Sequence, residues 1–229
     1  MSLKTNLKSI HIERIRRINA TKNIDEIALK DWNALIKKKI KVNERVKINL
    51  AYNFAKKLKY DHNNSNLYFS HTLRIDKMVL LHRRTVDIEL IILALNHNIL
   101  EVSNLSKKKI IDIFGSTFYE NISILTVNRK FQWNKNYKKK YYRNINNHSH
   151  SVKIIKILDK LDNLFIIGLN PNKKIRTKYI GEIEEYIFFS KILFANSCIP
   201  FFLEGQFRSA TFLPSSSSSI LNIFLSFTS

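Results

Sequence analysis

One apolar run, residues 86–101, constrains the fold of this chain more than any other segment. Its first part, DIELIILALN, is apolar enough to predict a helix buried in a protein core. The run then places His97 and Asn98 side by side, with Glu101 one helical turn further on. A buried His or Asn costs free energy unless it is hydrogen-bonded or bound to a ligand. The run therefore predicts a polar site inside a helical protein, or the remains of one.

The composition also favours helices. The chain of 229 residues contains only four Gly and three Pro, and 45% of its residues are hydrophobic. Sheet proteins of this size usually need more turn residues. The length suits one domain with an appendage. We therefore expect an all-α fold.

Hydrophobic residues recur with the period of a helix along most of the chain. Residues 44–60 predict a helix whose core face carries four residues spaced four apart, namely Val46, Leu50, Phe54 and Leu58. Further helices are predicted over residues 3–19, 25–36, 68–82, 86–101, 117–127, 151–169 and 174–196.

Two shorter segments carry end signals or a change in polarity. Ser106 is a preferred N-cap residue and Gly115 a preferred terminator, which together predict a helix between them. Residues 128–148 are polar, basic and aromatic, so we expect a long loop with some helix at its end.

The changes in composition predict three parts. Residues 1–43 would form N-terminal helices, and residues 44–198 would form the main helical domain. From Pro200 onward the only charged side chains are Glu204 and Arg208, and the sequence ends in FLPSSSSSILNIFLSFTS. Residues 199–229 are therefore expected to be a poorly ordered, low-complexity tail.

The formal net charge of +21 fits two explanations. One is a partner rich in phosphate, such as a nucleic acid. The other is a compositional bias toward Lys, which we favour because the Lys triplets at residues 37–39, 107–109 and 138–140 lie in separate segments.

Cysteine usage and hydropathy bear on the compartment. The single cysteine, Cys198, rules out an internal disulfide framework and fits a reducing cytoplasm. No secretory signal is recognisable at the N-terminus, and no stretch reaches the roughly 18 apolar residues that a membrane helix needs. We expect a cytoplasmic protein with no membrane partner.

Three of the apolar helices contain polar residues at positions that look buried. His71 lies in YFSHTLRIDKMV, His97 and Asn98 lie in LALNHNILEV, and Asp159 lies in IKILDKLDNL. Imidazole and oxygen ligands from separate helices can close on one divalent cation such as Mn, Fe or Zn. The pattern therefore predicts a metal site.

The same segments resemble a known family. LAYNFAKKLKY…LYFSHTLRIDKMV resembles the start of the hydrolase domain of RelA/SpoT homologues, with its "PYxxHP" motif. ALNHNILEVSNLSKKKIIDIFG is similar to that family's "ALLHDxxEDT…IxxxFG", and VKIIKILDKLDNL to its "VxxIKLADRLxNL". RTKYIGEIEEYIFFSKIL resembles the helix that follows. The four segments cover residues 45–195 in the family's order.

The resemblance implies an HD-domain helical phosphohydrolase fold for residues 44–198. Members of this family use Mn²⁺ to remove the 3′-pyrophosphate of guanosine tetraphosphate or pentaphosphate. Matching by position assigns most of the family's roles to residues of this chain. The metal ligands would be His71, His97, Asn98 and Asp159; the catalytic residues Glu101 and Asn163; and the substrate-binding residues His62, Tyr68 and Lys156.

Two positions depart from the family pattern. Asn98 stands where the family has the Asp of its HD motif, and Val102 stands where it has the second acid of a Glu-Asp pair. Each change removes a negative charge from the same predicted site. Losing a charged ligand should cost at least the roughly 10–100-fold in metal affinity that outer-shell changes cost. We therefore expect hydrolysis to be weakened or absent.

Two alternatives remain open from the sequence. His71, His97, Asp159 and Asn163 could form a buried hydrogen-bonded network in a non-catalytic nucleotide-binding or regulatory protein. Less favoured is a basic RNA-binding protein, in which the basic and aromatic residues of YKKKYYRN (137–144) contact RNA.

Overall fold

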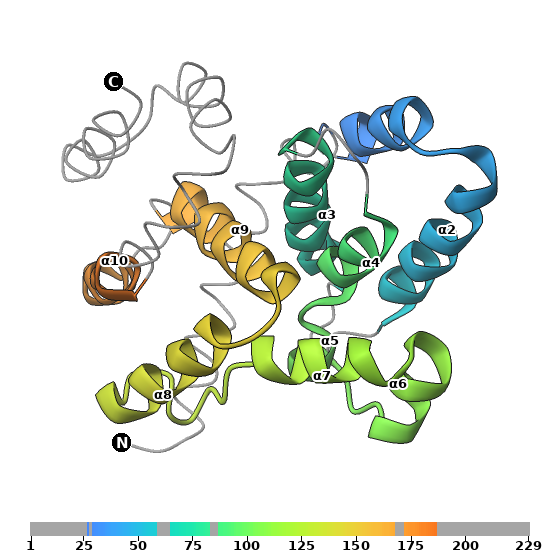
Figure 1. Ribbon diagram of the computed structural model, residues 1–229. Coiled ribbons are helices and arrows are strands. Elements are labelled where there is room, and N and C mark those ends of the chain that lie inside the picture. Colours follow the sequence, from blue (N-terminus) through green and yellow to red (C-terminus); the bar gives the residue numbers. More distant parts are fainter. Residues whose placement is uncertain (1–26, 28, 59–64, 83–86, 168–171, 187–229) are drawn as a thin grey trace. The chain divides into compact units, whose positions relative to one another are not determined.

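The computed structural model describes residues 27, 29–58, 65–82, 87–167 and 172–186 (Figure 1). The described residues contain helices and their connections but no strand, so the all-α prediction is confirmed. The chain forms two compact units, Met1–Asp162 and Asn163–Ser229. The predicted helix over residues 3–19 and the predicted tail over residues 199–229 lie outside the described residues. After a helix over residues 29–39, the elements are α2 (Val42–Lys57), α3 (Ser65–His82), α4 (Ile88–Asn96), α5 (Ile99–Val102), α6 (Lys107–Phe114), α7 (Ser116–Leu125), α8 (Lys135–Asn146), α9 (His150–Ile166) and α10 (Lys173–Tyr186).

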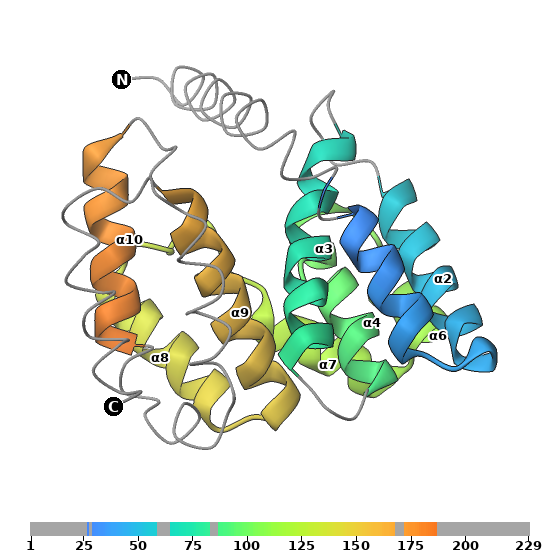
Figure 2. The ribbon, with the colours of Figure 1, turned by 90° about the horizontal axis from the view of Figure 1, so that it is seen from above.

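Helix α4 is the central element of the first unit. It packs against both α2 and α3 (Figure 2). The Asp87 side chain starts α4 by accepting a hydrogen bond from the backbone N–H of Leu90 at 3.2 Å. Every residue from Leu90 to Asn96 is buried. The apolar run therefore forms the buried helix that its composition predicts.

The predicted helix over residues 86–101 is wrong in one respect, because it is broken at His97 and Asn98. Helix α4 ends at Asn96, these two residues form a turn, and α5 follows. The His97 ring donates from Nδ1 to the carbonyl oxygen of Ala94 at 2.8 Å, and in a continuous helix that carbonyl would accept from the backbone N–H of Asn98. His97 and Asn98 therefore lie in a turn between two helices and not within a regular helix.

The predicted core face of α2 is only partly right: Leu58, just after the helix, is buried and Phe54 is half-buried, but the other two predicted residues are exposed. Val46 and Leu50 are 60% and 66% exposed, whereas Ile48, Ala51 and Ala55 are buried. Two of the three buried residues are alanines, and Asn96 of α4 donates from Nδ2 to the backbone carbonyl oxygen of Ala51 at 3.4 Å, so the two helices lie close together there. A close backbone approach, rather than the largest side chains, selects the buried face of this helix.

Residues 128–148 are more helical than predicted. Helix α8 covers Lys135–Asn146, and its start is capped by the Asn134 side chain, which accepts from the N–H of Tyr137 at 2.9 Å. Tyr141 and Tyr142 are buried, at 8% and 4% exposure, so they cannot stack on RNA bases. The aromatic part of the RNA-binding alternative is therefore wrong for these two residues.

The end signals around α6 are confirmed. Ser106 accepts a hydrogen bond from the N–H of Lys109 at 3.3 Å and caps the helix. Gly115 ends it with a φ of 89°, which is a left-handed conformation that favours glycine. The next helix, α7, begins immediately afterwards, at Ser116.

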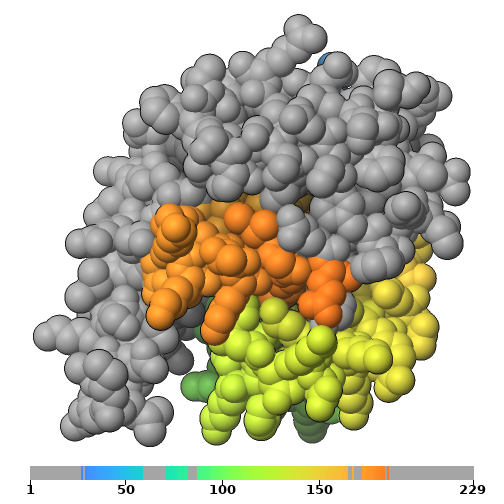
Figure 3. Space-filling model, turned by 90° about the vertical axis from the view of Figure 1, so that its left-hand side faces the viewer, coloured from blue at the N-terminus to red at the C-terminus, as the bar shows by residue number. Residues whose placement is uncertain are grey.

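The described part of the second unit contains the end of α9 and all of α10. The Asn172 side chain caps α10 by accepting from the N–H of Ile175 at 3.3 Å. Figure 3 shows the outer surface of α10 in orange. Lys173, Lys174 and Lys178 are exposed on this helix, whereas Glu182 and Ile183 are buried. None of the described helices combines the length and the apolar character that crossing a membrane requires.

A fully buried carboxyl group lies in the core of the first unit. Asp76 is 0% exposed, and its Oδ2 accepts a hydrogen bond from the indole N–H of Trp32, while its Oδ1 has no hydrogen-bond partner among the described residues. Burial raises the pKa of Asp76 well above its usual value, and the bond from Trp32 opposes this only in part. The fold therefore favours the neutral acid at this position.

We expect Asp76→Asn to stabilise the protein at alkaline pH. A carboxyl group whose folded pKa is raised contributes stability below its unfolded pKa, and this contribution is lost as the pH rises through the folded value. The amide cannot ionise, so the free energy of unfolding of the variant should rise relative to that of the unmodified chain as the pH increases from 5 to 9. Denaturant unfolding at pH 5, 7 and 9 measures this gain. Asp112→Asn, at an exposed position, is the control. If the unfolding free energies of Asp76→Asn and of the unmodified chain change with pH in the same way, the prediction is wrong.

Candidate metal centre

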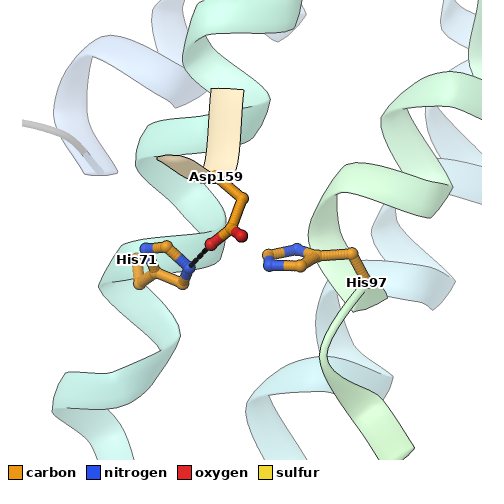
Figure 4. Close-up of side chains that lie close together, drawn as sticks. All are labelled: His71, His97 and Asp159. Atoms are coloured by element: carbon orange, nitrogen blue, oxygen red, sulfur yellow. Dashed lines mark ion pairs between the residues drawn. The ribbon is translucent and has the colours of Figure 1, made fainter. Parts of the chain in front are cut away.

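Three helices of the first unit bring two imidazoles and one carboxylate together. His71 lies in α3, His97 follows the end of α4, and Asp159 lies in α9. One ligand atom from each of the three lies within 4.8 Å of the other two (Figure 4). The sequence predicted this convergence from residues that are up to 88 positions apart (159 − 71).

The spacing of these atoms fits a single small cation. Ligands bonded at ~2.1 Å to one ion lie about 3.4 Å apart in a tetrahedral arrangement, and at most ~4.2 Å apart in any arrangement. The Nε2 atom of His71 and the Oδ1 atom of Asp159 are 3.3 Å apart. All three atoms lie within 4.8 Å of one another, so any pair of them would have to move closer by at most ~0.6 Å to bind the same ion. Two imidazoles and a carboxylate form a donor set that suits Mn, Fe or Zn.

The His97 ring is held in one orientation by the backbone. Because a carbonyl oxygen can only accept, its bond with Ala94 places the proton of the neutral ring on Nδ1. Burial, and then the positive charge of His71, lower the pKa of His97 to about 4. His97 is therefore neutral at physiological pH, and the lone pair on its Nε2 is available to a ligand.

The His71 ring lies between two carboxylates. Its Nδ1 is 2.7 Å from Oδ2 of Asp162, and its Nε2 faces Asp159. Burial alone would lower the pKa of His71, but hydrogen bonds and negative charge from Asp159 and Asp162 outweigh burial and raise this pKa to about 9. Without a metal ion, the positive charge on this ring offsets part of the negative charge at the site.

Lys156, which lies in α9 together with Asp159, also neutralises this carboxylate. The Nζ atom of Lys156 is 2.8 Å from Oδ2 of Asp159 and 5.3 Å from the ring centroid of Tyr141. The Tyr141 hydroxyl donates to the carbonyl oxygen of Leu125 at 2.6 Å, which fixes the tyrosine. Burial would raise the pKa of Asp159, but Lys156 and His71 hold it well below its usual value. Lys156 therefore directs a buried positive charge into the site.

The other predicted metal ligand and its neighbour lie in the turn and the short helix after α4. Asn98 is buried at 7% exposure, and its Nδ2 has no hydrogen-bond partner among the described residues. Val102 is half-buried in α5. A buried amide with a free donor is costly, and it marks position 98 as one where the present side chain does not suit its surroundings.

Glu101, a predicted catalytic residue, forms a hydrogen bond and an ion pair with the segment before α8. Its Oε1 accepts from the backbone N–H of Val127 at 3.0 Å, and its Oε2 pairs with Arg129. Asn163, also predicted as catalytic, is half-buried in α9, one helical turn beyond Asp159. Of the predicted substrate-binding residues, Tyr68 belongs to α3 but its side chain is outside the described part, and His62 lies outside the described residues altogether.

Two residues of this centre, Arg74 and Asp162, were not predicted from the sequence. Asp162 contacts His71 directly and forms two hydrogen bonds with Arg74. The sequence did contain a signal, because HTLR and DKLD carry their polar residues at the same spacing of three. Residues three apart lie on one face of a helix, so two such helices can pair face to face.

Comparison with known proteins supports the fold. No family model matches the chain, and no curated protein matches it. The chain is similar to a solved structure of a metazoan orthologue of SpoT that hydrolyses ppGpp and plays a role in starvation responses. The TM-score is 0.52 at 19% sequence identity, and the match covers 62% of this chain and 83% of the other. The predicted HD-domain helical fold is confirmed.

Proposed function

We propose that this chain is a metal-dependent phosphohydrolase of the HD type whose hydrolytic activity is weakened. The observation that carries the proposal is the convergence of His71, His97 and Asp159 from three helices, in the order in which the HD motif supplies its ligands. The likeness to a protein that hydrolyses ppGpp supports guanosine tetraphosphate as the substrate class. We propose Mn²⁺ as the ion.

The residues of this chain have distinct parts in the proposed reaction. His71, His97 and Asp159 would hold the ion, with Asn98 as a neutral fourth ligand. A divalent cation would make a water molecule more acidic and offset negative charge on the phosphoryl oxygens. Lys156, a buried cation beside Asp159, would attract the phosphate groups of the substrate. His62 and Tyr68 would contact the nucleotide, and Asn163 would orient the reacting groups.

The weakness of the reaction follows from missing negative charge and from an occupied carboxylate. The amide of Asn98 brings no charge to offset a divalent ion, and Val102 cannot position or deprotonate a water molecule. Glu101 is the remaining acid of the pair, and both of its oxygens are bound by the segment that contains Val127 and Arg129. Each oxygen keeps a second acceptor site, so Glu101 could still accept from a water molecule, but only in the orientation that Val127 and Arg129 impose.

Metal binding tests this function before any assay of turnover. We expect the unmodified chain to bind Mn²⁺ measurably and to release pyrophosphate from guanosine tetraphosphate slowly. His71→Ala and Asp159→Ala remove direct ligands, so each should lower the affinity for Mn²⁺ by more than ~100-fold. Isothermal titration with Mn²⁺ and a pyrophosphate-release assay measure the two effects. His148→Ala, a half-buried histidine outside the cluster, is the control and should change neither.

A non-catalytic nucleotide-binding protein is the second candidate. The observation that favours it is the charge balance of the site without a metal ion, since Lys156 and His71 already neutralise Asp159. In that case guanosine tetraphosphate should bind equally well with Mn²⁺ or with a chelator, and no pyrophosphate should appear. Binding that requires Mn²⁺ and is followed by hydrolysis would exclude this candidate.

A further inference from the structure

Two residue pairs with the same spacing face each other across α3 and α9. Helix α3 supplies His71 and Arg74, and α9 supplies Asp159 and Asp162. The distances are 3.3 Å between Nε2 of His71 and Oδ1 of Asp159, and 2.7 Å between Nδ1 of His71 and Oδ2 of Asp162. The His71 ring is thus bonded at both nitrogens, once toward the metal centre and once away from it.

The carboxylate of Asp162 is itself fixed. Arg74 donates from Nε to Oδ1 at 2.7 Å and from a terminal nitrogen to Oδ2 at 2.9 Å, which is the two-pronged geometry of the strongest Arg–carboxylate pairs. The side chains of Arg74 and Asp162 are 12% and 4% exposed, so water competes little for these bonds. Asp162 cannot rotate without breaking contacts to two partners.

A fixed carboxylate determines which nitrogen of His71 carries the proton. A carboxylate only accepts, so Nδ1 of His71 must donate to Asp162. When the ring is neutral, its lone pair is then on Nε2, the nitrogen that faces Asp159.

We propose that Asp162, held by Arg74, is a positioning residue of the metal centre that fixes the ring orientation and the tautomer of His71. The proposal rests on the metal-binding part of the proposed function and is independent of the nucleotide substrate. Carboxylate–histidine–metal arrangements of this kind raise the basicity of the ligand and typically change metal affinity by ~10–100-fold.

The alternative role for this ion pair is purely structural, a link between α3 and α9. The same helix offers a matched control, because Lys77, one turn after Arg74, pairs with Asp31 at 2.5 Å. The Lys77 side chain is 20% exposed, and neither Lys77 nor Asp31 belongs to the cluster of His71, His97 and Asp159. Breaking this second pair should affect stability without affecting the metal centre.

The test measures ion binding and unfolding in the same set of variants. Asp162→Asn keeps the shape of the side chain and removes its charge, and we expect it to lower Mn²⁺ and Zn²⁺ affinity by ~10–100-fold in chelator competition. Arg74→Lys keeps the charge but loses the two-pronged bond, so its loss should be smaller than that of Asp162→Asn. Lys77→Met should bind both ions like the unmodified chain, whatever its effect on unfolding.

A spectroscopic measurement separates positioning from support of the fold. Long-range ¹H–¹⁵N spectra of the Zn²⁺-loaded protein should show the His71 proton on Nδ1 in the unmodified chain, and Asp162→Asn should alter that signal. If Asp162→Asn fails to fold, the ion affinity of Arg74→Lys and the spectrum of the unmodified chain still show whether Asp162 positions His71. Unchanged ion affinity in both variants would overturn the positioning role and leave the proposed function standing. If the unmodified chain binds neither ion, the metal centre and this inference fail together.

Discussion

Restoring the two missing acids should raise the Mn²⁺ affinity and the pyrophosphate release of this chain by at least ~10–100-fold. In Asn98→Asp, a charged oxygen replaces a buried amide whose Nδ2 has no hydrogen-bond partner among the described residues, so no such bond is lost. Val102→Asp supplies the second acid from a half-buried position in α5. His71, His97 and Asp159 already lie together, so the repair requires no new scaffold. Because both groups serve the same reaction, their effects on hydrolysis should be more than additive.

The control for this double variant adds the same two charges at exposed positions. Asn104→Asp with Ile113→Asp should leave Mn²⁺ binding and hydrolysis unchanged, since both side chains are exposed. Two outcomes would contradict us. Strong hydrolysis by the unmodified chain would mean that Asn98 and Val102 are tolerated. A folded double variant that binds Mn²⁺ well but stays inert would mean that the loss extends to the nucleotide pocket, for example to His62.

The fold was largely predictable because helices leave a periodic pattern, but which face is buried was not. In α2 the pattern of large residues suggested a core face through Val46 and Leu50, yet both are exposed and Ala51 and Ala55 are buried. Periodicity locates apolar positions on a helix without locating the neighbouring helix. Here α2 packs against α4, and the carbonyl oxygen of Ala51 accepts a hydrogen bond from Asn96 of that helix. The turn at His97 was missed for a similar reason, since it depends on a side-chain bond to the backbone of Ala94.

The residues of the candidate site could be predicted where they lie in sequence motifs that follow one another in a recognisable order. His71, His97 and Asp159 each lie in a motif whose sequence and order are recognisable, and their side chains do converge. Asp162 and Arg74 were missed because their role exists only when α3 and α9 face each other. The engagement of Glu101 by Arg129 was missed too, since it depends on where the segment before α8 lies.

Lys156→Met should have opposite effects on the protein without metal and on metal binding. The Lys156 side chain is 7% exposed and its Nζ lies 2.8 Å from the Asp159 carboxylate, so removing it leaves a carboxylate that is only 14% exposed without its closest cation. Breaking a buried pair in this way costs about 3–5 kcal/mol. We therefore expect a large loss of unfolding free energy in the presence of a chelator, measured by denaturant titration.

Saturating Mn²⁺ should restore much of the lost unfolding free energy. The ion supplies positive charge beside Asp159, and in the variant it no longer competes with the Lys156 ammonium group for that carboxylate. By linkage, an ion that binds only the folded state stabilises it in proportion to the logarithm of its affinity. The gap in stability between Lys156→Met and the unmodified chain should therefore narrow as Mn²⁺ is added, and Mn²⁺ should bind more tightly to the variant. Binding of guanosine tetraphosphate should weaken, since the cation proposed to attract its phosphates is gone. Lys153→Met, a partly exposed position one turn earlier on α9, is the control. If Mn²⁺ stabilises neither protein, no ion binds at Asp159 and the metal centre would have to be abandoned. If Mn²⁺ stabilises both proteins equally, Lys156 does not compete with the ion and this prediction is wrong.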